Sequence, residues 1–104
     1  MARELKTINP ATEEVIDTYQ IMTKEQINEK TRKAQNAFLD WNKDIHKRAD
    51  HIHDFAQELR KSKEELARAM TKEMGRPIKD ARPEVEKCAW VMCTCADVAA
   101  RRAP

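Results

Sequence analysis

Glycine is almost absent from this sequence: Gly75 is the only one in 104 residues, and proline occurs four times. A dinucleotide-binding turn between a strand and a helix needs several glycines, because the backbone must approach the phosphates closely. The chain cannot supply such a turn. The same scarcity leaves no room for a flexible linker, and the length allows one domain at most. We therefore treat residues 1–104 as a single unit.

Long hydrophobic runs and an excess of one charge sign are also lacking. No apolar stretch approaches the length of a membrane span, and the opening MARELKTINP lacks the apolar centre of a signal peptide. Twenty basic residues face eighteen acidic ones, and the two signs are interspersed along the chain. The sequence therefore argues against a membrane or nucleic acid as a partner, and it favours a cytoplasmic location.

Cysteines are few and close together, at Cys88, Cys93 and Cys95. An odd number without a framework spacing indicates free thiols. On a helix, Cys88 and Cys95 fall near one face and Cys93 lies away from it, whereas metal ligands converge. We interpret Cys88 as a small core residue, with Cys93 or Cys95 exposed and oxidisable.

The first 21 residues have the pattern of a β-hairpin. Leu5–Ile8 and Val15–Tyr19 favour strands, and the turn-forming run between them begins Asn9-Pro10. A two-stranded ribbon alone is marginal in water, so it must lie against helices or extend another sheet.

Residues 22–104 have the pattern of amphipathic helices. Thr23 and Gln26 form a capping box for a helix over 24–42, whose apolar face comprises Ile27, Ala34, Phe38 and Trp41. Asp44 can cap a second helix over 45–61, with a buried stripe of Ala49, Ile52, Phe55, Ala56 and Leu59. We predict a mainly α fold: a short N-terminal hairpin followed by three or four amphipathic helices.

The helix ends after residue 61 depend on serine, glycine and proline. Ser62 with Glu65 forms a second capping box, which either restarts the helix after a kink, the version we favour, or decorates one long helix; Leu66, Ala69 and Met70 continue the stripe. Gly75, followed by Pro77, ends that helix near Met74. The last helix is predicted to begin at Lys79 or Pro83, with Pro83 in its first turn, and to end near Ala100.

Several clusters have both a functional and a structural interpretation. His46, Asp50 and His53 share a helical face, with His51 and Asp54 beside them, so a surface metal site is possible; no ligand from another element is indicated, and a solvated face is favoured. Phe38, Trp41, Phe55 and Trp90 occupy apolar stripes without a basic stripe, which favours a packed core over a base-stacking platform. The many Lys and Glu favour solvated faces with i,i+4 pairs, for example Glu29 with Lys33.

Four segments occur in an order and at distances that resemble the start of the aldehyde dehydrogenase superfamily, in particular succinate-semialdehyde dehydrogenases. They are TINPATEEVIDTY, KAQNAFLDW, KEELARAMTKEMGRPIKDAR and EVEKCAW, and the likeness covers roughly residues 5–91. The resemblance implies the entry hairpin and helical flank of a nucleotide-binding domain. Such enzymes oxidise aldehydes with NAD or NADP, using a cysteine nucleophile and a glutamate that activates water.

The resemblance places all of that chemistry in later sequence, so no residue here is carried over as catalytic or cofactor-binding. It implies at most part of a monovalent-cation site, at Thr7 and Glu73, with the other ligands elsewhere. The sequence also departs from the family where a turn usually written with glycine reads Ala11-Thr12-Glu13-Glu14. Glu13 must then adopt a conformation that glycine takes more easily, or the turn must be of another type.

Two hypotheses follow from the sequence. The first is an N-terminal fragment or truncated homologue of an NAD(P)-dependent succinate-semialdehyde dehydrogenase, catalytically incompetent alone, whose partner is the remainder of the enzyme. The second is a free-standing helical interaction module without enzymatic activity, which self-associates because the helix faces left uncovered in a short chain tend to pair.

Overall fold

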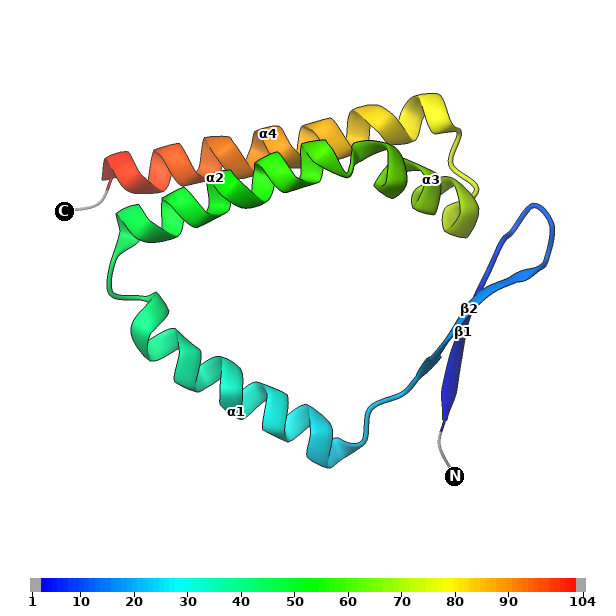
Figure 1. Ribbon diagram of the computed structural model, residues 1–104, viewed down its shortest axis with the longest axis horizontal. Helices are drawn as coiled ribbons and strands as arrows, with labels where there is room; N and C mark the ends of the chain where they lie inside the picture. The colour runs from blue at the N-terminus through cyan, green and yellow to red at the C-terminus, as the bar shows by residue number, and fades with distance from the viewer. Residues whose placement is uncertain (1–2, 103–104) are drawn as a thin grey trace.

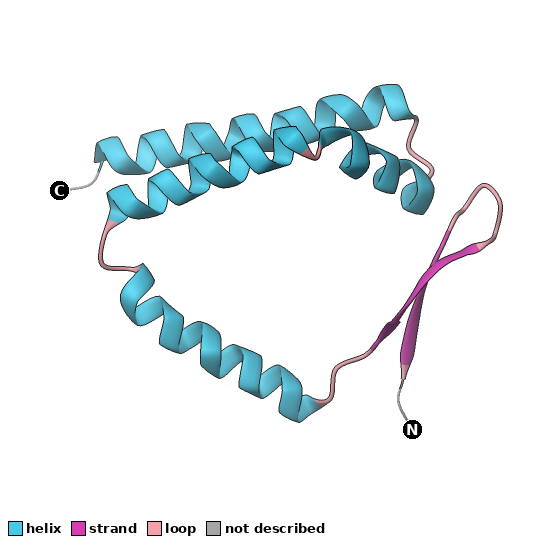
Figure 2. Cartoon of the chain, viewed as in Figure 1, coloured by secondary structure: helices cyan, strands magenta, loops and turns pink. Residues whose placement is uncertain are grey.

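The computed structural model describes residues 3–102, which form a two-stranded hairpin followed by four helices (Figures 1 and 2). The elements are β1 (Glu4–Ile8), β2 (Val15–Gln20), α1 (Lys24–Trp41), α2 (Ile45–Lys61), α3 (Lys63–Met74) and α4 (Ile78–Arg102). The mainly α fold with an N-terminal hairpin is confirmed. Figure 1 shows α2 and α4 side by side, with α3 beneath the start of α4 and α1 diverging from the other helices.

The hairpin is antiparallel, with Thr7 opposite Asp17 and a register shift after Thr7. Its loop is closed by two backbone hydrogen bonds: the Asn9 N–H donates to the Glu14 carbonyl at 2.9 Å, and the Glu13 N–H donates to the Asn9 carbonyl at 2.7 Å. Glu13 has φ 65°, in the left-handed region. The expectation that Glu13 takes the conformation usual for glycine is therefore confirmed.

The predicted caps of α1 and α2 are present. Gln26 donates its backbone N–H to Thr23 Oγ1 at 3.2 Å, and its side-chain Oε1 accepts the Thr23 N–H at 2.8 Å. Asp44 Oδ1 accepts the N–H groups of His46 and Lys47 at 3.0 and 3.2 Å. These bonds satisfy amides that no helical carbonyl can reach.

The kink at Ser62 is confirmed, but the second capping box is wrong. The Ser62 side chain makes no capping bond. Its N–H donates to the Glu58 carbonyl at 3.0 Å, and its carbonyl accepts the Leu66 N–H at 2.9 Å. The Ser62 backbone thus takes part in helical hydrogen bonds on both sides of the kink, without help from its hydroxyl. Gly75 ends α3 at φ 72°, as expected.

The last helix starts earlier than the proline pattern predicts. The Pro77 carbonyl accepts the N–H groups of Asp80 and Ala81 at 2.9 and 3.0 Å, so α4 begins at Ile78 and Pro83 lies inside it. Placing Pro83 in the first turn was wrong. The earlier start buries Ala81 against Ala67 of α3, and this packing offsets the hydrogen bond that the proline removes.

The core lies between α4 and the α2–α3 pair and is built from small side chains. Its buried residues are Ala49, Ala56, Ala67, Ala81, Val85, Ala89 and Ala96. The predicted stripe is therefore confirmed for Ala49 and Ala56 and wrong for Phe55, which is 53% exposed, and for Ala69, which is exposed. No residue of α1 is buried. Only alanine-lined faces meet, and the larger apolar side chains remain outside.

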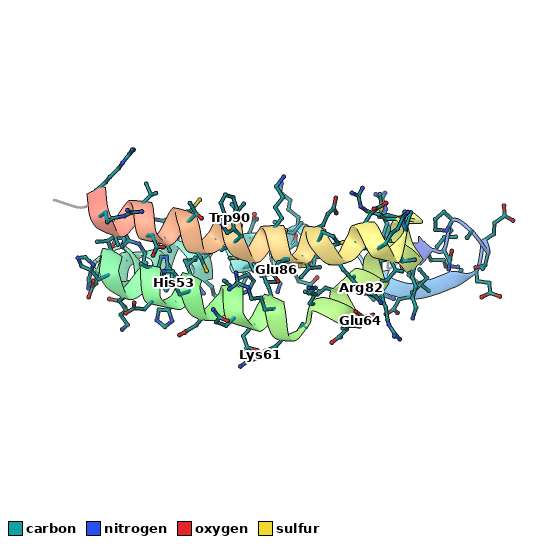
Figure 3. The ribbon with its side chains drawn as sticks, turned by 90° about the horizontal axis from the view of Figure 1, so that it is seen from above. His53, Lys61, Glu64, Arg82, Glu86 and Trp90 are labelled. Carbon is teal, nitrogen blue, oxygen red and sulfur yellow. The ribbon has the colours of Figure 1, made fainter. Side chains whose placement is uncertain are left out.

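Ion pairs join the two halves of this core across the helix interface, and Figure 3 labels four of their residues, His53, Glu64, Arg82 and Glu86. They are His53 Nε2–Asp97 Oδ1 at 2.8 Å, Arg60 Nε–Glu86 Oε1 at 2.8 Å, and Arg82 Nη2–Glu64 Oε1 at 2.8 Å with Arg82 Nε–Glu64 Oε2 at 2.9 Å. Residue numbers that increase along α2 and α3 pair with residue numbers that decrease along α4, so the ion pairs fix an antiparallel register of these helices.

The overall dimensions show that the chain forms a thin layer. The radius of gyration is 17.9 Å and the extents are 52 × 40 × 17 Å, whereas a compact domain of this length has a radius of about 13 Å. The accessible surface is 8583 Å², against roughly 6,000 Å² for a folded monomer of this mass. Much surface that a compact domain would cover is therefore open.

The left-handed residue in the hairpin loop gives a first prediction. Glu13→Gly removes a steric cost of about 1 kcal/mol, so the exchange protection of the hairpin amides should rise roughly fivefold. Glu14→Gly is the matched control: Glu14 lacks a positive φ, and glycine there should lower protection because it adds backbone freedom to the unfolded state. Hydrogen exchange followed by NMR measures both. Equal effects of the two variants would contradict the assignment of strain to Glu13.

The Glu64–Arg82 pair gives a pH-dependence prediction. Hydrogen bonding to Arg82, with help from Arg68, lowers the pKa of Glu64 from 4.5 to about 2. A lowered folded-state pKa stabilises the fold above the unfolded value, and this stabilisation is lost as pH falls from about 4.5 through about 2. Glu64→Gln should therefore flatten the fall of the urea midpoint over that range.

Glu65→Gln is the matched control, because Glu65 is a neighbouring carboxylate outside every ion pair found in residues 3–102. It should leave the pH profile of the urea midpoint close to that of the unsubstituted chain. A Glu64→Gln profile as steep as the control would show that the cross-helix pair does not contribute.

Candidate functional site

The charged side chains at the helix interface are held in fixed ionisation states. Arg60 is the main cause of the lowered pKa of Glu86, through a direct hydrogen bond, and Glu64 and Glu86 in turn raise the pKa of Arg82 and Arg60. Both carboxylates are thus ionised at neutral pH and already accept strong hydrogen bonds. A general acid or base needs a pKa near the working pH, so these pairs are structural.

The histidines of α2 are engaged separately. His53 is paired with Asp97 of α4, and the His51 ring lies 5.4 Å from the Trp41 ring, tilted by 34°. In residues 3–102 no three His, Cys, Asp or Glu side chains come together in a way that could hold a metal ion. The contacts of His51 and His53 link α2 to the last residue of α1 and to α4.

The cysteines correct one prediction. Cys88 is exposed, so its interpretation as a core residue was wrong. The buried line of α4 passes through Val85 and Ala89, and Cys88 falls beside that line. Cys95 is exposed, as considered possible, and Cys93 is half-buried with its Sγ 4.0 Å from Arg60 Nη1.

The aromatic side chains correct a second prediction, that of a packed aromatic core. Phe38, Trp41, Phe55 and Trp90 are 50%, 46%, 53% and 59% exposed, so the expectation of a packed aromatic core was wrong. Their helical spacing correctly marks apolar faces, but within residues 3–102 those faces are left uncovered. Exposed aromatic side chains on ordered helices are typical of surfaces that bind a partner.

Thr7 and Glu73 lie on β1 and near the end of α3, elements that contact each other. Thr7 Oγ1 is buried and has no hydrogen-bond partner. Glu73 acts on the hairpin: after Asp17 and burial, its charge is a further cause of the raised pKa of Tyr19. An orphaned oxygen and a carboxylate on two contacting elements are donors that a hard cation accepts, but two donors fall short of a coordination shell. The cation site stays a prediction.

An apolar groove runs between α2 and the second half of α4. It encloses about 410 Å³ and is lined by Trp41, Ile45, Arg48, Ala49, Ile52, Val91, Met92, Cys95, Ala96 and Ala99. Its lining carries one charged side chain, Arg48, whose Nη1 donates to the Trp41 carbonyl at 3.2 Å. Such a lining can receive an apolar segment but offers no nucleophile aligned with a base. We take this groove, together with the apolar face of α1, as the candidate docking site.

Sequence reasoning missed the cross-helix ion pairs. It expected i,i+4 pairs such as Glu29 with Lys33, whereas Glu29 is bonded to Arg32 at 2.6 and 3.0 Å. The signal lay in register: Arg60 and Glu64 are four apart on the α2–α3 side, as are Arg82 and Glu86 on α4, so an antiparallel pairing brings opposite charges together.

No helix in residues 3–102 is long and apolar enough to cross a bilayer.

Residues 1–104 match the aldehyde dehydrogenase family. The chain is 38% identical over 81 residues to malonate-semialdehyde dehydrogenase 1 of Shouchella clausii, covering 77% of this chain and 16% of that protein. It is also 38% identical over 89 residues to the succinate semialdehyde dehydrogenase [NAD(P)+] Sad of Escherichia coli, covering 81% and 19%.

A crystal structure of betaine aldehyde dehydrogenase from Staphylococcus aureus in complex with NAD+ has the same fold over this segment. The TM-score is 0.85 at 24% identity, covering 92% of this chain and 20% of that one. The chain thus spans about a fifth or less of the proteins it matches. The match over its whole length, with the identity to both semialdehyde dehydrogenases, shows that the chain belongs to the aldehyde dehydrogenase family.

Proposed function

We propose that the chain serves as the N-terminal segment of an NAD(P)-dependent semialdehyde dehydrogenase, without catalytic activity of its own. Its role is to complete the fold of a larger subunit. The apolar face of α1 and the groove between α2 and α4 pack against the rest of that subunit. The remainder of the subunit supplies the nucleophile, the water-activating carboxylate and the cofactor-binding turn. The single observation that carries this proposal is the uncovered apolar surface on a segment that matches a family of much longer enzymes.

The size of the open surface supports docking onto a larger body. The chain exposes roughly 2,500 Å² more than a compact monomer of its mass would. A standard interface covers roughly 800 Å² per partner, so the excess is large enough for an obligate contact. Ile27, Phe38 and Trp41, each about half exposed, give α1 an apolar stripe on which the one aromatic contact found in residues 3–102 is that of Trp41 with His51.

The semialdehyde class of substrate is proposed from the relatives, whose names specify malonate and succinate semialdehyde. Of these, we favour succinate semialdehyde, as the sequence segments suggest. NAD or NADP would be bound by the remainder of the subunit, since the residues of this chain lack a glycine-rich turn. We place the assembled enzyme in the cytoplasm.

The proposal predicts that the 104-residue chain alone does not oxidise a semialdehyde. Purified chain mixed with succinate or malonate semialdehyde and either NAD or NADP should produce no cofactor reduction, followed at the nicotinamide absorbance. Turnover above background, after removal of host dehydrogenases, would contradict the assignment of the chemistry to the remainder.

The proposal also predicts complementation. Escherichia coli Sad lacking its matching N-terminal segment should regain activity when this chain is co-expressed with it, to a fraction of the level restored by its own segment. Phe38→Asp with Trp41→Asp should abolish the recovery, because a buried charge without a partner costs several kcal/mol. Asn36→Asp, on the polar side of α1, is the control and should preserve it. Equal recovery with both would refute docking through α1.

Self-association is the second candidate, and the same exposed surface favours it when no remainder is present. A second copy could cover the groove by exchange of the terminal helix, or extend the hairpin by edge pairing. Light scattering should then give a dimer or a larger assembly of the 12.1 kDa chain, and Phe38→Asp with Trp41→Asp should shift it toward a monomer. A well-folded monomer at high concentration would exclude this module.

A further inference from the structure

A shallow patch beside the first half of α4 combines unpaired lysines with an exposed tryptophan, and we name it the lysine–tryptophan patch. Its residues are Lys63 at the start of α3 and Lys79, Arg82, Glu86, Lys87 and Trp90 on α4. They border an open hollow of about 740 Å³. Trp90 is 59% exposed, and Figure 3 shows it on α4 with Glu86 and Arg82 along the same helix.

The charge of the patch is set by the ion pairs at the helix interface. Its one carboxylate, Glu86, is bonded to Arg60 of α2, and its one guanidinium, Arg82, is bonded to Glu64. None of the ion pairs formed within residues 3–102 includes Lys63, Lys79 or Lys87. Lys63 only adds to the lowering of the Glu86 pKa, after Arg60, so all three ammonium groups lack a direct ion-pair partner there and can interact with an external anion.

The patch faces away from the docking site described above. With 3.6 residues per turn, Lys79 and Trp90 lie close to one line along α4, because they are eleven residues apart. The buried Val85 and Ala89 and the groove residue Met92 lie on other sides of that helix. A body that covers the groove and α1 would therefore leave the patch accessible, and the patch does not depend on the proposed function.

The shape and composition favour a polypeptide over a small molecule. Small-molecule sites are enclosed, whereas this hollow is open and bordered by lysines. An exposed tryptophan is the side chain that most often anchors a protein contact, and surrounding charges steer and orient the partner. Nucleic acid is disfavoured, because three free lysines neutralise few phosphates and the net charge is only +2.

We propose that the lysine–tryptophan patch binds an acidic segment of a separate polypeptide. Carboxylates of that segment pair with Lys63, Lys79 and Lys87, and an apolar side chain between them packs on the Trp90 indole. Both contacts form without breaking an existing ion pair of α4, because Glu86 and Arg82 keep their partners.

The test uses a fluorescein-labelled peptide of repeating Glu-Glu-Leu and measures its anisotropy with the whole chain. Binding should weaken as salt rises, and Lys79→Glu with Lys87→Glu should weaken it by on the order of tenfold or more, about 1.4 kcal/mol per factor of ten. Trp90→Ala should also weaken binding, with less effect on its salt dependence. Circular dichroism checks that each variant keeps its helices.

The matched control is Lys30→Glu with Lys33→Glu on α1, which changes the net charge equally and should leave peptide binding nearly unchanged. Equal loss with both double variants would show general charge attraction and overturn the proposal. The proposal would also fail if no binding were seen, if Trp90→Ala had no effect, or if an oligonucleotide displaced the peptide from the chain at lower concentration than unlabelled peptide does.

Discussion

The structure depends on one constraint: α4 packs against α2 and α3 through alanines. With Ala56, Ala67, Ala81 and Ala89 fully buried, the helix backbones can approach closely, and Val85 is the largest side chain enclosed between them. Close approach aligns the flanking charges, so that arginines of α2 and α4 reach carboxylates on the opposite side. Each alanine, however, removes little apolar area from water, so this interface stabilises the chain less than a core of leucines would.

The larger apolar side chains are not covered by this interface. Phe38 and Trp41 on α1 and Phe55 on α2 remain about half exposed, and the chain spreads into a layer 17 Å thick. A segment built this way leaves a large apolar surface open to contact with another body. This agrees with a chain that belongs to the aldehyde dehydrogenase family and spans about a fifth of the length of its relatives.

Local signals in the sequence predict the helix ends well, because a cap is decided by a few neighbouring residues. Thr23 and Asp44 cap their helices with side-chain oxygens, and Gly75 ends α3 in the left-handed conformation. Glu13 also adopts the left-handed conformation that its turn requires. Ser62 and Pro83 depart from the local expectation in different ways. At Ser62 the predicted boundary is present but the side chain does not cap it, whereas at Pro83 the helix is continuous because its earlier start buries Ala81 against Ala67.

Burial is harder to predict than helix ends, since periodicity identifies an apolar face but says nothing about what covers it. The stripe of α1 is correct as a pattern, yet the part of the chain described here provides no surface to meet it. Cys88 shows the same limit: it is adjacent to the buried Ala89 in the sequence, yet its own side chain is exposed. The register of α4 against α2, which no single helix encodes, decides between these outcomes.

The same register divides α4 into two surfaces of different chemistry. On one side, alanines and Met92 continue the core into an apolar groove whose one charged lining residue is Arg48. On the other, pairing of Glu86 with Arg60 and of Arg82 with Glu64 consumes the carboxylates and leaves lysines around Trp90. This face of α4 is therefore cationic, because its carboxylate Glu86 is paired with Arg60 across the helix interface. The charge of this surface is a property of the packed pair of helices, and neither helix alone would have it.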